Sequence, residues 1–79
     1  MDKIKGYGTY YYTDKDYYEG EWYANKRSGW GRQYYKNGDI YEGEWLNDER
    51  SGKGMLRLGF NLRKNLDDFR YEFQFFNSI

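Results

Sequence analysis

The sequence predicts an all-β protein assembled from repeated β-hairpins, and three observations predict this class. A segment with aromatic residues and glycines at fixed positions recurs after 23 residues, which is typical of a chain of similar structural units. Inside each unit two kinds of side chain alternate with a period of two residues, as in a strand with one covered face. Short polar stretches separate these segments, as hairpin turns do.

The first predicted strand of a unit is Tyr18–Trp22. Its aromatic residues and Gly20 alternate with Glu19 and Glu21, so the aromatic set lies on one face of the strand and the acids face solvent. The same pattern returns at Tyr41–Trp45. We therefore expect two equivalent strands, one in each unit.

A polar stretch follows the first strand and predicts a turn over Ala24–Ser28, after which Gly29–Tyr35 returns as the second strand. The next turn is predicted at Lys36–Asp39, because Asn-Gly is a strong hairpin signal in which both residues tolerate positive φ. Ile40 then starts the next strand. Run backwards, the same offset aligns Gly6–Gly8 with the Gly-x-Gly of the second strand, so the chain opens midway through a unit.

The glycines inside the predicted strands recur with the unit. Glycine normally weakens a strand, so we expect the space it leaves to be filled by Tyr and Trp rings lying against the backbone. Translation by one unit would then place Trp22 near Trp45 and Tyr18 near Tyr41. The glycines with this structural role are Gly20, Gly29, Gly31, Gly43, Gly52 and Gly54.

The repeat divides the chain into a partial unit over residues 1–15, units over 16–38 and 39–58, and a divergent tail over 59–79. Two structures fit the tail. One stripe of an amphipathic helix would carry Leu62, Leu66, Phe69, Phe73 and Phe76, with Asn65 and Asp68 as a capping pair. The alternating aromatic residues from Phe69 to Phe75 also fit a strand, so a short C-terminal helix and an added strand both remain open.

The chain of 79 residues has eleven Tyr, five Phe and three Trp but no His, Cys or Pro. Its length allows one small domain with a thin core, since a chain of this size buries only about 60% of its unfolded surface. Because aliphatic side chains are few, that core must be aromatic. Without Cys or His there is no disulfide, usual zinc ligand set, thiol nucleophile or imidazole base, so we expect no catalytic residue, metal or cofactor.

Acidic and basic side chains balance at thirteen each. The chain therefore lacks the positive field typical of nucleic-acid binders, and we expect no nucleic-acid partner. No secretory signal or membrane-spanning apolar run is recognisable, so an intracellular, cytoplasmic protein is expected. The acids of the predicted strands, Glu42 and Glu44 in the second, indicate a solvated face rather than a calcium or glycosidase site.

The spacing Tyr-x-Gly-x-Trp, six residues and then Gly-x-Gly, on a 23-residue period, resembles the MORN repeat family from Gly6 to about Leu58. The resemblance implies a single-layer twisted antiparallel β-meander that acts as a non-catalytic protein-interaction scaffold. Within the family the chain is similar to a male germ-cell and flagellar member, which implies partners in the sperm flagellum, the acrosome region or ciliary axonemes. The family name refers to membrane occupation, so the alternative is a peripheral membrane or phosphoinositide-binding module.

A single-layer sheet leaves part of its aromatic face open, and open aromatic patches usually mark partner sites. We expect a helix or an extended segment of a partner protein to lie there. The candidate contact residues are Tyr18, Trp22, Tyr23, Trp30, Tyr34, Tyr35, Tyr41 and Trp45.

Two pairs of cations are predicted to lie in equivalent hairpin loops and to project along one edge: Lys26 with Arg27, and Arg50 with Lys53. These side chains suit a phosphate or a lipid headgroup, as the membrane alternative requires. Charges in hairpin loops are more often simply solvated, and acidic residues neighbour the second pair.

Overall fold

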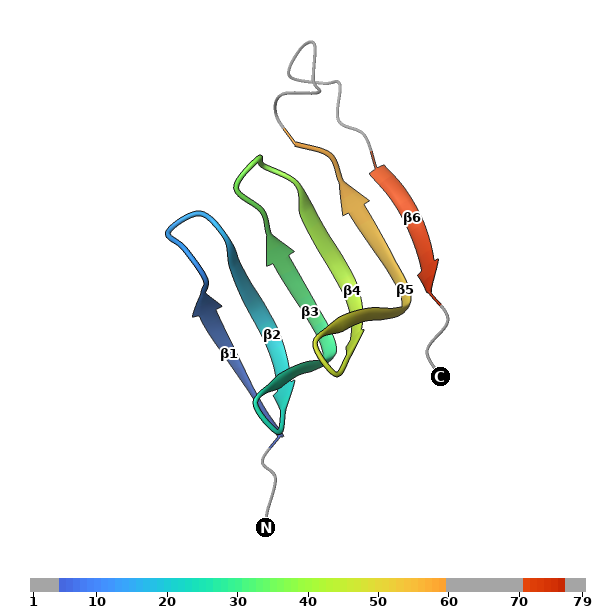
Figure 1. Cartoon of the computed structure of the whole chain (residues 1–79). Helices are drawn as coiled ribbons and strands as arrows, with labels where there is room; N and C mark the ends of the chain where they lie inside the picture. The colour runs from blue at the N-terminus through green and yellow to red at the C-terminus, as the bar shows by residue number, and fades with distance from the viewer. Residues whose placement is uncertain (1–4, 60–70, 77–79) are drawn as a thin grey trace.

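The computed structural model describes residues 5–59 and 71–76. These residues form one open antiparallel sheet of six strands in chain order, each strand paired with the next (Figure 1). The strands are β1 Lys5–Tyr11, β2 Tyr17–Tyr23, β3 Lys26–Tyr34, β4 Ile40–Leu46, β5 Glu49–Arg57 and β6 Tyr71–Phe76. The predicted all-β hairpin meander is confirmed.

The sheet is a single layer, with extents of 50 × 29 × 14 Å. All six described strands belong to this one sheet, so no second sheet packs on it within the described residues. Within the described ranges, no helix has the length and hydrophobicity needed to cross a membrane.

The helical alternative for the tail is wrong for Tyr71–Phe76, which form β6 and pair with β5. The physical reason is that β5 would otherwise leave its backbone groups unpaired along a full edge, and β6 satisfies them while bringing Phe76 to the aromatic core. The other residues of the proposed helical stripe and its capping pair, Leu62, Asn65, Leu66, Asp68 and Phe69, lie outside the described residues.

Two hairpin loops are shorter than the sequence predicts. The turn expected over Ala24–Ser28 is wrong in extent, because the loop is only Ala24–Asn25 and β3 already begins at Lys26. Both loop residues have positive φ, 54° and 66°, as a two-residue type I′ turn requires. Asn47–Asp48 repeats this geometry with φ of 51° and 71°.

The Asn-Gly loop has a different geometry. Only its Gly38 has a positive φ, 96°, and the Gly38 N–H donates to the Tyr35 carbonyl at 2.9 Å. The Tyr35 N–H donates to the Asp39 carbonyl at 2.9 Å, which closes a three-residue loop ending in a left-handed glycine. The turn is where the sequence placed it, but Asn-Gly does not occupy the two central positions of a type I′ turn.

The core is a row of rings on one face of the sheet, hereafter the ladder face: Trp22, Tyr18, Trp45, Tyr41 and Phe76. Each ring meets the next edge to face, with centroids 5.1, 5.3, 5.4 and 6.2 Å apart along the row. The expected direct neighbours Trp22 with Trp45 and Tyr18 with Tyr41 are therefore wrong. One unit spans two strand spacings, about 10 Å, which is too far for direct ring contact, so Tyr18 lies between the two tryptophans.

Glycines and hydrogen bonds fix the positions of these rings. The Tyr18 ring lies so close to Gly31 that a Cβ there would overlap it, and Tyr41 lies in the same way against Gly54. Each ladder tryptophan donates its indole N–H to a strand carbonyl, Trp22 to that of Gly8 at 3.0 Å and Trp45 to that of Gly31 at 3.1 Å. Gly8 and Gly31 are also one unit apart.

Two acids of the face expected to be solvated also accept hydrogen bonds from the backbone. β-Bulges interrupt the pairing beside Glu21 and Glu44. The Glu21 carboxylate accepts the Trp30 N–H at 2.7 Å, and that of Glu44 accepts the Lys53 N–H at 3.1 Å. These carboxylates satisfy amides that the irregular pairing leaves without a strand partner.

Candidate partner-binding surface

Three of the predicted contact residues are buried in the core of the sheet. Tyr18 and Tyr41 are 0% exposed and Trp45 is 5% exposed. Their rings pack on one another, on the glycine backbone and under neighbouring side chains. They form the core of the ladder face, so a partner would touch what lies around them rather than the rings themselves.

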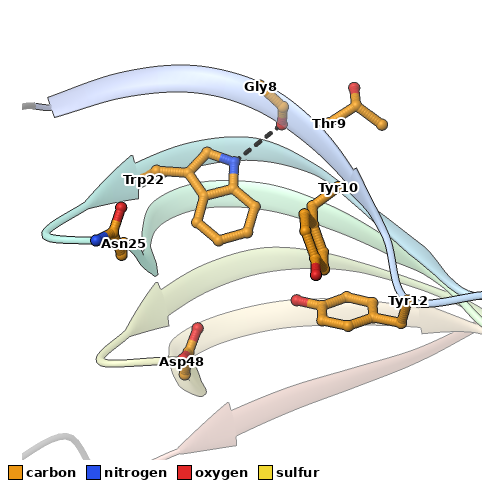
Figure 2. Close-up of a pocket in the computed structure, with 7 residues that line it drawn as sticks. All are labelled: Gly8, Thr9, Tyr10, Tyr12, Trp22, Asn25 and Asp48. Carbon is orange, nitrogen blue, oxygen red and sulfur yellow. Dashed lines mark hydrogen bonds between the residues drawn. The ribbon is translucent and has the colours of Figure 1, made fainter.

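The ladder is open at its β1 end, where Trp22 is only half-buried. A hollow of about 500 Å³ lies beside its ring (Figure 2). The lining residues are Gly8, Thr9, Tyr10, Tyr12, Trp22, Asn25 and Asp48. Tyr10 and Tyr12 are 56% and 46% exposed and touch each other with centroids 5.0 Å apart, and Tyr10 also meets the edge of Trp22 at 6.2 Å.

Sequence reasoning did not select Tyr10 and Tyr12. They precede the first complete Tyr-x-Gly-x-Trp motif, so a search built on that motif passes over them. The available signal was the backward offset of 23 residues, which aligns Tyr12 with the candidate Tyr35.

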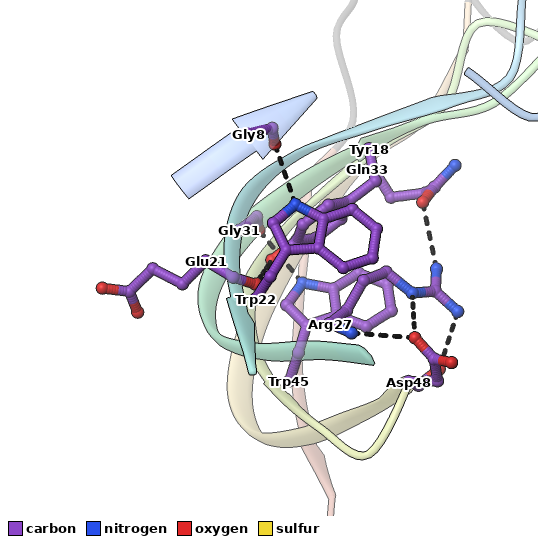
Figure 3. Close-up of polar contacts among 9 residues, drawn as sticks. All are labelled: Gly8, Tyr18, Glu21, Trp22, Arg27, Gly31, Gln33, Trp45 and Asp48. Atoms are coloured by element: carbon purple, nitrogen blue, oxygen red, sulfur yellow. Dashed lines mark hydrogen bonds and ion pairs between the residues drawn. The ribbon is translucent and has the colours of Figure 1, made fainter. Parts of the chain in front are cut away.

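Arg27 covers the second tryptophan of the ladder. Its guanidinium carbon lies 4.5 Å from the centre of the Trp45 ring. Nε and the backbone N–H both donate to Asp48 Oδ1, at 3.2 and 2.8 Å, while Nη2 donates to the Asp48 carbonyl at 2.7 Å. Nη1 donates to Gln33 Oε1 at 3.1 Å (Figure 3). The side chain is therefore fully engaged inside the fold.

Arg50 has the equivalent place one unit later. Its guanidinium carbon lies 4.3 Å from the centre of the Tyr41 ring and 5.4 Å from that of Tyr35. Nη1 donates to Gln74 Oε1 at 3.1 Å, and Nη2 donates to the Tyr35 hydroxyl. Tyr35, a predicted contact residue, is half-buried against the core by this arrangement.

The four cations considered for a lipid headgroup are divided between two environments. The predicted loop positions are wrong for all four, which lie in β3 and β5. Arg27 and Arg50 are held against the ladder rings. Lys26 and Lys53 are exposed. Lys26 is adjacent to Arg27 in one strand and so points to the other face. The structure therefore does not gather the four charges into one cluster.

The opposite face of the sheet carries a second set of aromatic residues. Tyr11, Tyr17 and Tyr34 stack across three strands with centroids 4.7 and 4.3 Å apart. Trp30 is 47% exposed, and its indole N–H donates to the Glu42 carboxylate at 3.3 Å. Beside it lies a hollow of about 620 Å³ lined by Trp30, Glu42, Lys53, Gly54, Met55, Phe73 and Phe75.

The predicted contact residues thus lie on both faces. By strand alternation, Tyr23, Trp30 and Tyr34 share the opposite face. The ladder face carries the other five: Tyr18, Trp22, Tyr35, Tyr41 and Trp45.

The pKa values of the buried tyrosine hydroxyls indicate a packing role rather than acid–base chemistry. Burial raises the pKa of the Tyr18 hydroxyl to about 12 and raises the pKa of Tyr41 as well. Both groups therefore stay protonated at neutral pH. Among the residues of the two described segments, no three His, Cys, Asp or Glu side chains gather as a metal site. The arrangement offers rings, amides and carbonyls suited to binding.

Comparison with known proteins agrees with this geometry. A model of the MORN repeat matches residues 1–17, 18–40 and 41–58, which together cover most of the chain. The chain belongs to the MORN repeat family. A search of curated proteins finds no match. MORN repeats are a non-catalytic repeat type and generally act as protein- or membrane-interaction modules.

The second and third of the matched MORN repeats begin at Tyr18 and Tyr41, each at the start of an aromatic strand pattern. Each therefore supplies one ladder tyrosine and one ladder tryptophan, then an arginine nine residues after the tyrosine. Because Arg27 and Arg50 are equivalent in this numbering, their similar ring contacts are a property of the MORN unit in this chain.

Proposed function

We propose that this MORN sheet is a non-catalytic scaffold that holds a helix or an extended segment of a partner protein on its ladder face. The observation that carries the proposal is the open end of the ladder, where Trp22, Tyr10 and Tyr12 surround a hollow of about 500 Å³. Aromatic side chains that are fixed on one side and open on the other are typical anchors of protein interfaces.

The predicted contact residues have different roles in this proposal. Trp22 touches the partner directly, and Tyr35 does so farther along the ladder. Tyr18, Tyr41 and Trp45 act from beneath, because their burial fixes the position of the rings and arginines that a partner meets. The other three predicted contact residues lie on the opposite face, away from the proposed partner segment, and do not touch it: Tyr23, Trp30 and Tyr34.

We also propose the setting in which the scaffold works. The run from Tyr17 to Leu58 resembles the middle of MORN repeat-containing protein 3, a male germ-cell and flagellar member of the family. The proposed partners are accordingly cytoplasmic proteins of the sperm flagellum, the acrosome region or ciliary axonemes.

Affinity capture from germ-cell extract tests the scaffold with two single variants as bait. Trp22→Ala removes the open ladder ring, and Trp30→Ala removes an exposed ring from the opposite face as a matched control. We expect proteins captured by the parent chain to be retained by Trp30→Ala and lost with Trp22→Ala. Circular dichroism checks that both baits are folded. A folded Trp22→Ala bait that retains the same proteins would refute the ladder-face proposal.

The membrane alternative is tested with the same chain. Because Arg27 and Arg50 are engaged with rings, headgroup contact would depend on the exposed Lys26 and Lys53. Vesicles containing phosphatidylserine or a phosphoinositide are mixed with the protein at low salt. The scaffold proposal predicts no co-sedimentation. Vesicle binding by the parent chain that is abolished in the double variant Lys26→Glu and Lys53→Glu would favour the membrane-binding alternative over the scaffold.

A further inference from the structure

Arg27 occupies a defined slot on the ladder face. The floor of the slot is the Trp45 ring, whose indole N–H donates a hydrogen bond to the Gly31 carbonyl. One wall is the loop residue Asp48, which accepts from the guanidinium through both its carboxylate and its carbonyl. The other wall is Gln33, which accepts at 3.1 Å. Planar stacking combined with several acceptors around the rim is the geometry that suits a guanidinium.

The same slot exists one unit earlier, beside Trp22. Moving back 23 residues replaces Trp45 by Trp22, Gly31 by Gly8, Asp48 by Asn25 and Gln33 by Tyr10. All four replacements line the hollow at the open end of the ladder. The Trp22 indole N–H is tied to the Gly8 carbonyl at 3.0 Å, as Trp45 is to Gly31. The indole ring and its hydrogen bond are thus reproduced, and Asn25 places a neutral oxygen acceptor where the next unit has the Asp48 carboxylate.

The cation is not reproduced. The position equivalent to Arg27 is Ile4 in the sequence, which carries no charge. Trp45, under its arginine, is 5% exposed, whereas Trp22 is half-buried and lines the hollow. The sequence therefore builds the receptor for a guanidinium in two consecutive units and supplies the guanidinium in only one of them.

We propose that the hollow beside Trp22 binds an arginine side chain of the partner segment. This inference deepens the proposed function and depends on it for the partner. The guanidinium stacks on the Trp22 indole, as Arg27 does on Trp45, and donates to the side-chain oxygen and carbonyl of Asn25. Arginine is favoured over lysine because its planar group can stack and donate in a fork at the same time, which an ammonium cannot.

The surrounding charges permit a further cation. Asp48 lines the hollow, and its side chain is 44% exposed. Arg27, whose guanidinium carbon lies 5.6 Å from the centre of the Tyr12 ring, is paired with Asp48 at 3.2 Å, so its charge is balanced locally. Arg27 and Arg50 already lie one unit apart on this face. A partner guanidinium stacked on Trp22 would lie one unit before Arg27 and so continue the same spacing.

The three tryptophans make the test specific. The indole N–H resonances of the ¹⁵N-labelled full chain are followed while N-acetyl-arginine amide is added. We expect a saturable shift at Trp22 with a dissociation constant in the millimolar range, as one stacked cation allows. The resonances of Trp45, whose slot is filled, and Trp30, on the opposite face, should stay in place. N-acetyl-citrulline amide, which has nearly the same shape without the charge, should not shift Trp22.

A matched pair of variants tests the rim. Asn25→Asp restores the carboxylate that Asp48 provides in the next unit, and positive φ is tolerated because Asp48 itself adopts it. Asn47→Asp adds the same charge in the equivalent loop without lining the hollow. We expect Asn25→Asp to bind the arginine probe roughly threefold or more tightly than the parent, because a charge-assisted hydrogen bond replaces a neutral one. Asn47→Asp should bind like the parent.

Several results would overturn the arginine site: no saturable shift at Trp22, an equal shift at Trp30, an equal effect of citrulline, or an affinity of Asn25→Asp no greater than that of Asn47→Asp. These failures are distinct from failure of the scaffold. If the probe does not bind but Trp22→Ala still abolishes partner capture, the scaffold stands and the arginine site is wrong. If the probe binds but capture is insensitive to Trp22→Ala, the site stands and the scaffold proposal is wrong.

Discussion

At the scale of single residues, the sheet depends on the contact between a tyrosine and a glycine. Tyr18 lies against Gly31, and its hydroxyl donates to the Glu21 carbonyl at 2.9 Å. A ring can lie flat on a strand only where no Cβ intervenes. The burial of Tyr18 in a single-layer sheet therefore requires a glycine on the neighbouring strand.

Gly31→Ala should destabilise the fold by about 2 kcal/mol or more, because the added methyl group would displace the Tyr18 ring from the core. Gly6→Ala is the matched control in another strand, since a Cβ at Gly6 would meet no heavy atom within 4 Å. Thermal denaturation followed by circular dichroism compares the two. Equal melting temperatures for the two variants would contradict the ring-on-glycine account.

The buried hydroxyl of Tyr18 makes stability depend on alkaline pH. Its pKa is about 12 in the folded chain against an ordinary value of 10.0, so the unfolded chain loses this proton first as the pH rises. The contribution of this protonated hydroxyl to the free energy of unfolding is fully present below about pH 10 and is lost between about pH 10 and 12. Tyr41, whose pKa is also raised by burial, contributes in the same direction.

We therefore expect the free energy of unfolding from urea titrations to fall across this alkaline range. The free energy of unfolding of Tyr18→Phe should decrease less steeply with pH than that of the parent, because the variant lacks one of the two buried hydroxyls. A parent chain with the same stability at pH 9 and pH 11 would contradict the assignment of the raised pKa to burial.

At the scale of elements, strand positions could be predicted, but the details of the loops could not. Alternation of side chains is a local property, so it located Tyr18–Trp22 and Tyr41–Trp45 within β2 and β4. The type I′ loops fall on Ala24–Asn25 and Asn47–Asp48 instead of Asn37-Gly38. The length of each loop depends on the register in which its two strands pair. β-Bulges shift this register, and the sequence pattern did not reveal them.

β6 shows the same limit. Its alternation of aromatic residues fitted a strand and a helical stripe equally well. The strand is decided by the free edge of β5 and by the ring of Tyr41, which Phe76 meets at 6.2 Å. Both lie far from β6 in the sequence.

Phe76→Ala should cost about 1–2 kcal/mol because this half-buried ring closes the ladder next to Tyr41. Phe73→Ala lies in the same strand and is the matched control. The Phe73 ring is 76% exposed, so its loss should cost less than about 0.5 kcal/mol. Urea denaturation measures both values, and equal costs would mean that the ladder does not extend to β6.

At the scale of the whole molecule, the sheet behaves as a one-dimensional array. Each strand pairs only with its neighbours in the chain, so stability should depend on contacts between adjacent units. The sealed residues Tyr18, Gln33, Tyr41, Trp45 and Ser51 lie in β2 to β5. The two outer strands have only one partner each within the described residues.

Hydrogen exchange should therefore show a gradient along the sheet. Paired amides of β3 and β4 should exchange most slowly, and those of β1 and β6 should exchange faster because the outer strands open without disturbing the ladder. Amide exchange measured residue by residue tests this. Uniform protection of all six strands would indicate a single cooperative unit and contradict the array.

The sequence by itself determined the unit of this protein: its period, its strands and its aromatic core. It also paired glycine with large rings, which holds for Gly31 and Gly54, whereas carboxylates of Glu21 and Glu44 fill the space at Gly29 and Gly52. The period, the strands and the core follow from residue spacing, which acts locally and repeats. The tertiary structure decided how the units meet. It placed Tyr18 between the two tryptophans, laid Arg27 over Trp45 and left Trp22 beside an open hollow. These features depend on distances across neighbouring strands, which no single unit of sequence contains.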